Sequence, residues 1–304
     1  MLVARATLQS VLVRGYTLIR ALALRTLRSL AVLLLAVLCS AMLVRFAPGS
    51  NVDERELVGG LSNESVQRIR EERATRHDLY TFFSQYVGDI VAGRTLNSEL
   101  YGESIAPVLR ERLETTAQTV SKGLLIGWCA ALLLAIILSV NASTFAVAVA
   151  GLGTAILLSV PSAVFAVLCL LAQLPPYLAI AATVFPRVFP VAEEQFRASM
   201  TAPHVIFARA KGLSGARLLL AHVIPGTIPP LLALGGVSVI LAIGISIPVE
   251  ALVDSPGVGQ LAWKAALGRD LPVLVTITLV ITTLTIVLNW CIDLILLATR
   301  LRSL

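Results

Sequence analysis

The chain has 304 residues, of which 57% are hydrophobic and only 14% are charged, and its mean hydropathy is +0.87. Because soluble globular proteins carry about 25% charged residues, this composition excludes an ordinary soluble domain and predicts an all-α polytopic membrane protein. The net charge of +6 comes from basic residues beside apolar runs. That is a positive-inside pattern, so we expect contact with membrane lipid and no nucleic-acid partner.

The chain begins with a basic segment. Residues 1–26 combine arginines with apolar residues at helical spacing, which predicts an amphipathic arm on the inner membrane surface. A frayed, partly ordered tail is the alternative. Leu27–Phe46 follows as an apolar run of about twenty residues, enough to cross a hydrocarbon core of about 30 Å. Ala47-Pro48-Gly49 then ends this first predicted span.

A polar stretch follows at about 47–115. Between residues 50 and 112 it holds eleven acidic and eight basic side chains. We expect a long extracytoplasmic loop that is helical in parts.

Further apolar runs complete six predicted spans. After the first, they are Ala117–Val140, Phe145–Ala172 (interrupted by Pro161), Tyr177–Ala192 (containing Pro186 and Pro190), Ile228–Val249 and Pro272–Thr299. We expect both termini, the turn at 141–144 and the loop at about 193–227 in the cytoplasm. This orientation keeps the five arginines before residue 30, together with Arg300 and Arg302, on the inner side.

The usual signatures of enzymes and metal sites are missing from the sequence. It contains no P-loop, HExxH, CxxC or GxSxG pattern. The three histidines are widely separated and predicted to lie in loops, and the four cysteines lie inside apolar runs, where they behave as small buried hydrophobes. We therefore expect no catalytic residue, no metal and no cofactor in this chain. Acids are also scarce within the spans, which argues against a secondary transporter driven by an ion gradient.

The central loop between the fourth and fifth spans is short, basic and prone to form helices. Pro203 suits a first helical turn, and Gly212 suits a C-terminal stop because it tolerates a left-handed backbone. Ser214 can cap a second short helix that we expect Pro225-Gly226 to break before the fifth span. Alternating small residues within this loop would allow a partner surface to approach closely. We predict a cytoplasmic docking element; an ordinary solvated loop is the alternative.

Several motifs occur in one order between about residues 25 and 299. Before the second span come Glu111-Arg112-Leu113 and Thr115-Thr116, and the third span contains an S-x-P at Ser159–Ser162. The central loop contains Ala208–Leu213, followed by His222 and then by Ile228-Pro229. After the fifth span, Glu250 precedes Pro256–Gly259, and the sixth span is flanked by Arg269–Val273 and Asn289…Asp293. In this order they resemble binding-protein-dependent ABC transporter permeases. The closest pattern is that of the B-type subunit of the dipeptide, oligopeptide and nickel uptake family.

The resemblance implies the type I ABC importer permease fold at 27–304 and an assembly in the bacterial plasma membrane. A second permease, expected to be a different chain, would complete the translocation path. Two cytoplasmic ATPases would hold the ATP and magnesium, and an extracytoplasmic binding protein would deliver the cargo, most commonly peptides. The residues implied to couple to the ATPases are Ala208, Arg209, Ala210, Lys211, Gly212, Leu213, Arg217 and His222.

A second set of residues lies beyond the fifth span. Glu250, Pro256, Gly257 and Gly259 fit the family's outer motif, which implies gating or contact with the binding protein. The alternative for Glu250 is a helix-end acid satisfied by Lys264, Arg269 or water. We expect Asp254 and Asp270 to be solvated loop acids.

The sequence also departs from the family pattern. The outer-loop motif is reduced at Gly93–Ser98, His204 replaces a tyrosine, and residues 176–200 contain extra prolines and acids. These departures leave open a member that carries nickel or another small solute. They also leave open a scaffold or assembly subunit that no longer transports.

Overall fold

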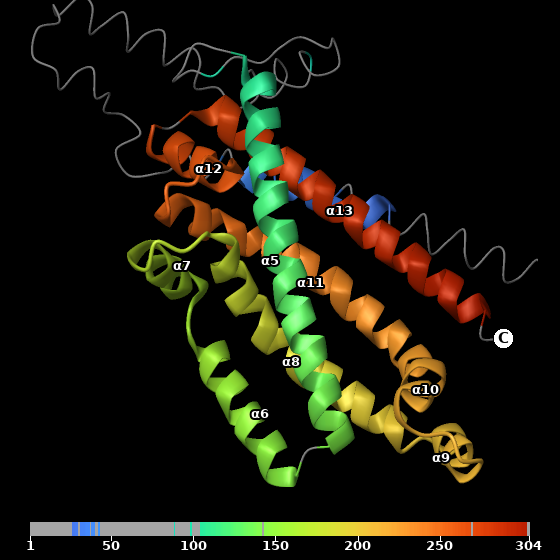
Figure 1. Cartoon of the computed structure of the whole chain (residues 1–304). Coiled ribbons are helices and arrows are strands. Elements are labelled where there is room, and N and C mark those ends of the chain that lie inside the picture. Colours follow the sequence, from blue (N-terminus) through green and yellow to red (C-terminus); the bar gives the residue numbers. More distant parts are fainter. Residues whose placement is uncertain are drawn as a thin grey trace, which may run out of the picture. The chain divides into compact units, whose positions relative to one another are not determined.

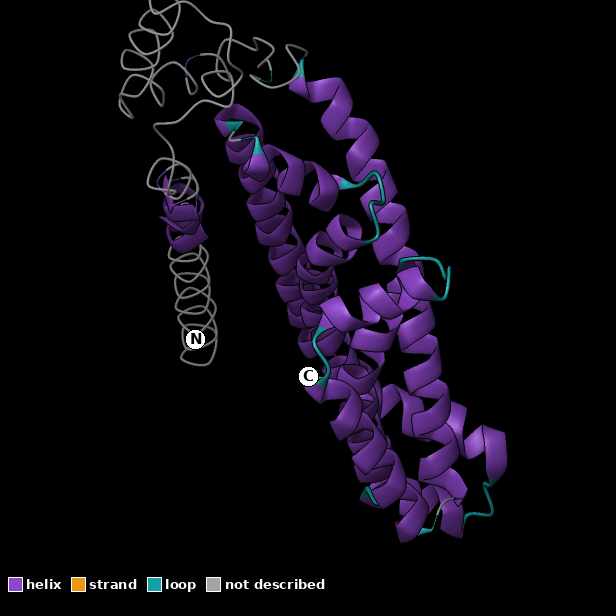
Figure 2. Ribbon diagram, turned by 90° about the vertical axis from the view of Figure 1, so that its left-hand side faces the viewer, coloured by secondary structure: helices purple, strands orange, loops and turns teal. Residues whose placement is uncertain are grey.

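The computed structural model describes residues 26–29, 31–36, 38–39, 42, 88, 98, 104–141, 143–268 and 270–302. Residues 1–25 of the predicted arm, the end of the predicted first span at 43–46 and most of the predicted outer loop therefore lie outside the described residues. What is described forms helices joined by short turns (Figure 2). The chain divides into two compact units, 1–99 with 269–286 and 100–268 with 287–304, which we treat separately.

The second unit contains the helices that carry the candidate site (Figure 1). In chain order they are α5 (Ile105–Asn141), α6 (Thr144–Ser159), α7 (Ser162–Leu171), α8 (Tyr177–Met200), α9 (Pro203–Ala210), α10 (Gly215–Leu218), the π-helical turn η1 (Leu219–Val223), α11 (Ile224–Leu252) and α12 (Val258–Leu267). The long helix α13 (Leu271–Arg302) follows and belongs to both units. Figure 1 shows α9 and α12 at opposite ends of α11.

The centre of the second unit is a close contact between α5 and α8. Small residues recur every four positions on α5, at Gly123, Gly127, Ala131 and Ala135, and all four are buried. Added to Gly123, a Cβ atom would lie 2.7 Å from the Cβ of Ile180 and 2.8 Å from a backbone oxygen on α8. Helices in membranes pack through such small-residue faces because lipid supplies no hydrophobic force between them. The glycines therefore allow the two backbones to approach.

Pro161 divides the predicted third span into two helices. Ser143 caps α6, its Oγ accepting a bond of 3.3 Å from the Ala146 N–H. The backbone becomes extended at Val160 and Pro161, and α7 continues at an angle of 89° to α6. Proline has no N–H to continue a helical ladder, so the predicted interruption is confirmed. Together α6 and α7 form either one broken span or a re-entrant segment.

Not every predicted span is a helix that is long and apolar enough to cross a membrane. Three helices among the described residues, α5, α11 (with α10 and η1) and α13, are long and apolar enough to cross a membrane, and the bent α6–α7 pair brings the number to four. The predicted fourth span is α8, a continuous helix through Pro186 and Pro190 that runs on to Met200. Its charged residues make it less apolar than the others. Burial compensates, because half of its residues are packed inside the protein.

Asp270 differs from the prediction of a solvated acid. It is only 1% exposed and lies at the start of α13. One carboxylate oxygen accepts the hydroxyl of Ser98, and the other accepts the Val273 N–H at 3.2 Å. The carboxylate thus satisfies a donor in the first turn of α13, where acids are favourable. It also connects the helix to the last residue of the reduced motif at Gly93–Ser98.

The α5–α8 contact leads to a stability prediction. We expect Gly123→Ala to lower the free energy of unfolding by about 1–3 kcal/mol, because overpacking forces two tightly packed helices apart. The control is Gly151→Ala on α6, where an added Cβ meets nothing within 4 Å. Thermal unfolding of the two purified variants in detergent measures the difference. Equal melting temperatures would show that the close approach does not matter.

Candidate functional site

The first candidate site is α9, which begins as the sequence predicts. Pro203 occupies the first turn, where its missing N–H costs no hydrogen bond. At the other end the Leu213 N–H donates to the Ala208 carbonyl at 3.2 Å, and the Gly212 N–H donates to the Arg209 carbonyl at 2.9 Å. Gly212 has a φ of +86°, so the helix ends in a Schellman motif that needs glycine. The predicted C-terminal stop is confirmed.

The segment after α9 differs from the prediction. Ser214 precedes α10 but makes no side-chain cap bond. Pro225 and Gly226 do not interrupt the helix before the fifth span, because α10, η1 and α11 follow one another without a gap from Gly215 to Leu252. The reason is position: Pro225 lies in the first turn of α11, directly after the π-helical turn, where proline is tolerated.

One face of α9 packs against the rest of the second unit. Val205 is 0% exposed and Ala208 is 3% exposed. Ala208, which was predicted to couple to the ATPases, packs into the hydrophobic core. Its part in coupling stays a prediction.

Polar contacts connect α8, α9 and η1. The hydroxyl of Ser199, near the end of α8, donates to the Val223 carbonyl at 3.0 Å, and Nε2 of His204 lies 3.3 Å from the His222 carbonyl oxygen. Both histidines therefore lie in helices and not in loops, and the contact made by His222 is through its backbone. The first bond joins α8 to η1, and the second joins α9 to η1, which continues directly into α11.

The opposite face of α9 is apolar and exposed. The exposed fractions of Ile206 and Phe207 are 56% and 62%, and Ala210 is also exposed. Lys211 Nζ lies 4.6 Å from the centroid of the Phe207 ring, a distance typical of a cation–π contact. Arg209 is exposed at the edge of this face. We call Ile206, Phe207, Arg209, Ala210 and Lys211 the outward face of α9.

Sequence reasoning missed Ile206 and Phe207 because it followed the motif that begins at Ala208. The helical spacing of PHVIFARA indicates which of these residues share a face. Residues 205 and 208 lie on one side of a helix and residues 206, 207 and 210 on the other. Of the remaining predicted coupling residues, Gly212 and Arg217 are exposed and Leu213 is half-buried.

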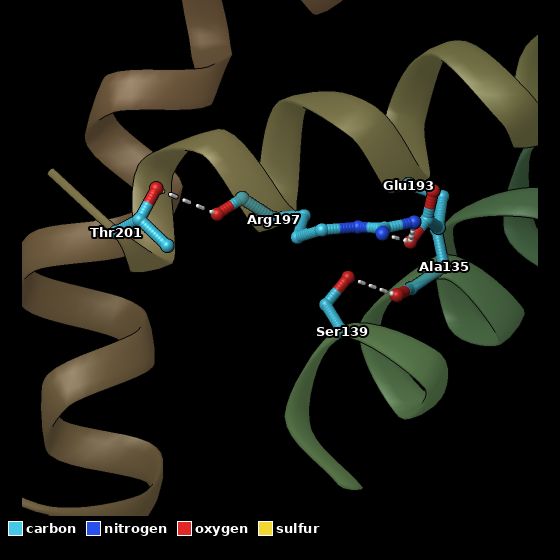
Figure 3. A network of polar contacts seen from close by, with 5 residues as sticks. All are labelled: Ala135, Ser139, Glu193, Arg197 and Thr201. Atoms are coloured by element: carbon cyan, nitrogen blue, oxygen red, sulfur yellow. Dashed lines mark hydrogen bonds and ion pairs between the residues drawn. The ribbon is translucent and has the colours of Figure 1, made fainter. Parts of the chain in front are cut away.

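A charged pair stabilises the end of α8 that leads into α9. Arg197 Nη2 and Nε lie 2.6 Å and 3.0 Å from the same carboxylate oxygen of Glu193. Figure 3 shows the Arg197 side chain running back along α8 toward Glu193, beside Ala135 and Ser139 of α5. An acid four residues before a base is the favourable order on a helix. The pair therefore supports the last turns of α8.

The second candidate site surrounds Glu250, which is 0% exposed. One oxygen of its carboxylate accepts the Gly259 N–H at 2.8 Å and the Thr116 hydroxyl at 3.1 Å. Thr116 in turn accepts the Val258 N–H at 2.8 Å. The carboxylate and the hydroxyl thus satisfy two donors at the N-terminus of α12, whose own cap position is a glycine without a side chain. Both bonds are made to Oε2, whereas Oε1 is buried without a hydrogen-bond partner among the described residues. Lys264 instead lies 3.5 Å from Asp254.

Two glycines make room for this arrangement. On Gly257, an added Cβ would lie 2.1 Å from Oε2 of Glu250, and on Gly259 it would lie 2.5 Å from the Ile247 Cα. Both glycines are buried, whereas Pro256 is exposed. The outer motif of the sequence therefore joins α5, α11 and α12 at one point.

A chain of polar contacts extends from this point to the surface. Arg112 Nη1 donates to Gln260 Oε1 at 2.8 Å, and the Gln260 amide donates to Asp254. Asp254 also lies 3.5 Å from Lys264 Nζ. The prediction that Asp254 is a solvated acid agrees with its side-chain exposure of 80%.

We expect Thr116→Val to lower the free energy of unfolding by about 1–3 kcal/mol, because it leaves the buried Val258 N–H without an acceptor. Thr115→Val is the matched control, since the Thr115 hydroxyl only donates to the Glu111 carbonyl of its own helix at 3.3 Å. Thermal unfolding in detergent compares the two. A Thr115 variant that loses as much as the Thr116 variant would contradict the assignment.

Comparisons with known proteins agree with the resemblance seen in the sequence. The oligopeptide transport system permease protein OppB of Haemophilus influenzae is 37% identical over 87 residues, which span 28% of this chain and only 28% of the relative. The probable peptide ABC transporter permease protein y4tP of Sinorhizobium fredii is 23% identical over 305 residues, which span 89% of this chain and 94% of the relative.

A solved structure of the MetNI methionine ABC transporter in inward-facing conformations has the same fold. The TM-score is 0.56 at 16% sequence identity, and the match covers 63% of this chain and 96% of that chain. The family model of the binding-protein-dependent transport system inner membrane component matches residues 123–301, more than half of the chain and all of α9 to α12. The chain therefore belongs to the family of inner membrane components of binding-protein-dependent transport systems.

Proposed function

We propose that this chain is a permease subunit of a peptide-importing ABC transporter in the bacterial plasma membrane. It would form the translocation path with a second, different permease chain. Two cytoplasmic ATPases would bind ATP and magnesium, and a binding protein would deliver peptides from outside. Family membership and the printed names of OppB and y4tP support this assignment.

The outward face of α9 is the observation that carries the proposal. No acidic residue occurs from Gln195 to Val249, so every charged side chain on α9 and in the helices directly after it is basic. The predicted positive-inside orientation would put this end of the bundle in the cytoplasm, away from lipid. An apolar patch in water needs a protein partner. An apolar groove with an acidic rim on the ATPase would match it in shape and charge.

The contacts of α9 explain how a movement of the ATPase would reach the membrane. Val205 and Ala208 are buried, and Ser199 and His204 bond to the backbone of η1. A force applied to the outward face is therefore transmitted to α8 and α11 together.

We expect Phe207→Ala to weaken association with the ATPases by roughly tenfold or more, because a buried aromatic anchor is worth about 2 kcal/mol at an interface. ATP-dependent uptake of a labelled peptide should fall with it. Recovery of the ATPases with the purified permease and uptake into proteoliposomes measure the two effects.

Leu267→Ala supplies the control, since Leu267 is similarly exposed (66%) but lies at the end of α12. This variant should keep both activities. If Phe207→Ala retained the ATPases and the uptake as well as Leu267→Ala does, α9 would not be the docking element. If the unaltered chain bound the ATPases but imported no peptide, it would instead be the non-transporting scaffold subunit, which is the alternative function.

A further inference from the structure

A stripe of polar side chains runs along one side of α13. Its members are separated by four, three, four and four residues: Thr278, Thr282, Thr285, Asn289 and Asp293. At about 100° per residue these five positions fall within an arc of roughly 80°. All five lie inside the apolar segment Leu271–Ile295 that is long enough to span a membrane.

The other side of α13 is mainly apolar and open, with Thr276 and the exposed Thr283 as its polar members. The Thr276 hydroxyl is satisfied on its own helix, where it donates to the Pro272 carbonyl at 2.6 Å. Leu284, Val287 and Leu294 are 40%, 51% and 54% exposed, and Cys291 on the same side is also exposed. This is the composition expected of a surface that faces lipid. Polar side chains in a membrane span instead face the protein interior or water. The polar stripe therefore faces away from lipid.

Within the part of the chain that the structure describes, Asn289 is the stripe residue that is left exposed, while the other four are half-buried. Thr285 satisfies its hydroxyl on its own helix, donating to the Ile281 carbonyl at 2.8 Å. Asparagine presents two N–H donors and a carbonyl, and Asn289 is exposed. On the edge beside the stripe, Ile292 packs tightly against Gly236 of α11, where an added Cβ would lie 2.1 Å from Ile292 Cδ1. An exposed amide next to a packed edge requires water or a polar ligand.

We propose that Thr282, Thr285 and Asn289 line the aqueous path through which the cargo crosses the membrane, with Thr278 and Asp293 extending the same face. The inference rests on the proposed function, which gives this chain half of a shared path. The ligand class is the peptide main chain. Its alternating N–H and C=O groups match hydroxyl and amide side chains that donate and accept without charge.

Cysteine labelling in the assembled transporter tests the inference. Single cysteines replace Thr282, Thr285 or Asn289 in a chain whose four native cysteines are changed to serine or alanine. The matched controls are Val287→Cys in the same background and a chain that keeps only Cys291, both on the apolar side. A charged, membrane-impermeant methanethiosulfonate is applied to both sides of membrane vesicles. Because the reagent needs a hydrated thiolate, we expect the stripe cysteines to react about tenfold faster than the controls.

Equal or slower labelling of the stripe would overturn the inference, since the stripe would then lie in a dry contact with the second permease. The readout requires neither ATP hydrolysis nor uptake. If Phe207→Ala left the ATPases bound, the coupling proposal would fail while fast labelling still supported an aqueous stripe. If only the labelling failed, the coupling proposal would be unaffected.

Discussion

The close packing of α5 against α8 is the constraint on which the second unit depends. Gly123 and Gly127 let the two backbones approach, and no larger side chain fits at Gly123 without moving Ile180 or the α8 backbone. In lipid, such packing replaces the hydrophobic force that holds a soluble core together. Once α8 is fixed, its charged last turns, braced by Glu193 and Arg197, set where α9 begins. The position of α9 therefore follows from a contact deep in the bundle.

The two ends of the unit meet the same requirement in different ways. Backbone donors at helix ends must find acceptors when water is excluded. At the α12 end, Glu250 and Thr116 supply acceptors from other helices, and glycines give the carboxylate space. At the α9 end, Pro203 removes a donor and Gly212 closes the last turn on the backbone itself. The first arrangement locks three helices together, whereas the second leaves the outward face of α9 free for a partner.

Local features of the site were predictable from the sequence, but features that depend on tertiary packing were not. Pro203, Gly212 and Pro161 act through their own backbone preferences, so their effects on helix ends were foreseen. Burial of Glu250 and Asp270 depends on Thr116 and Ser98, which are more than a hundred residues away in the chain. Pro225 was expected to break a helix because the π-helical turn before it leaves no signature in composition. Ile206 and Phe207 were missed because burial of Val205 and Ala208, which defines the outward face, appears only in the fold.

In the proposed mechanism, α9 receives an ATPase and passes its movement to α8 and α11. The most direct measurement is site-specific photo-crosslinking in the assembled transporter, with a benzophenone side chain at Ala210 in the middle of the outward face. Ala266, exposed on α12, carries the probe in the comparison variant. The account predicts an adduct between the permease and the ATPase from Ala210 and none from Ala266. Absence of an ATPase adduct at Ala210, in a complex that still contains the ATPase, would contradict it.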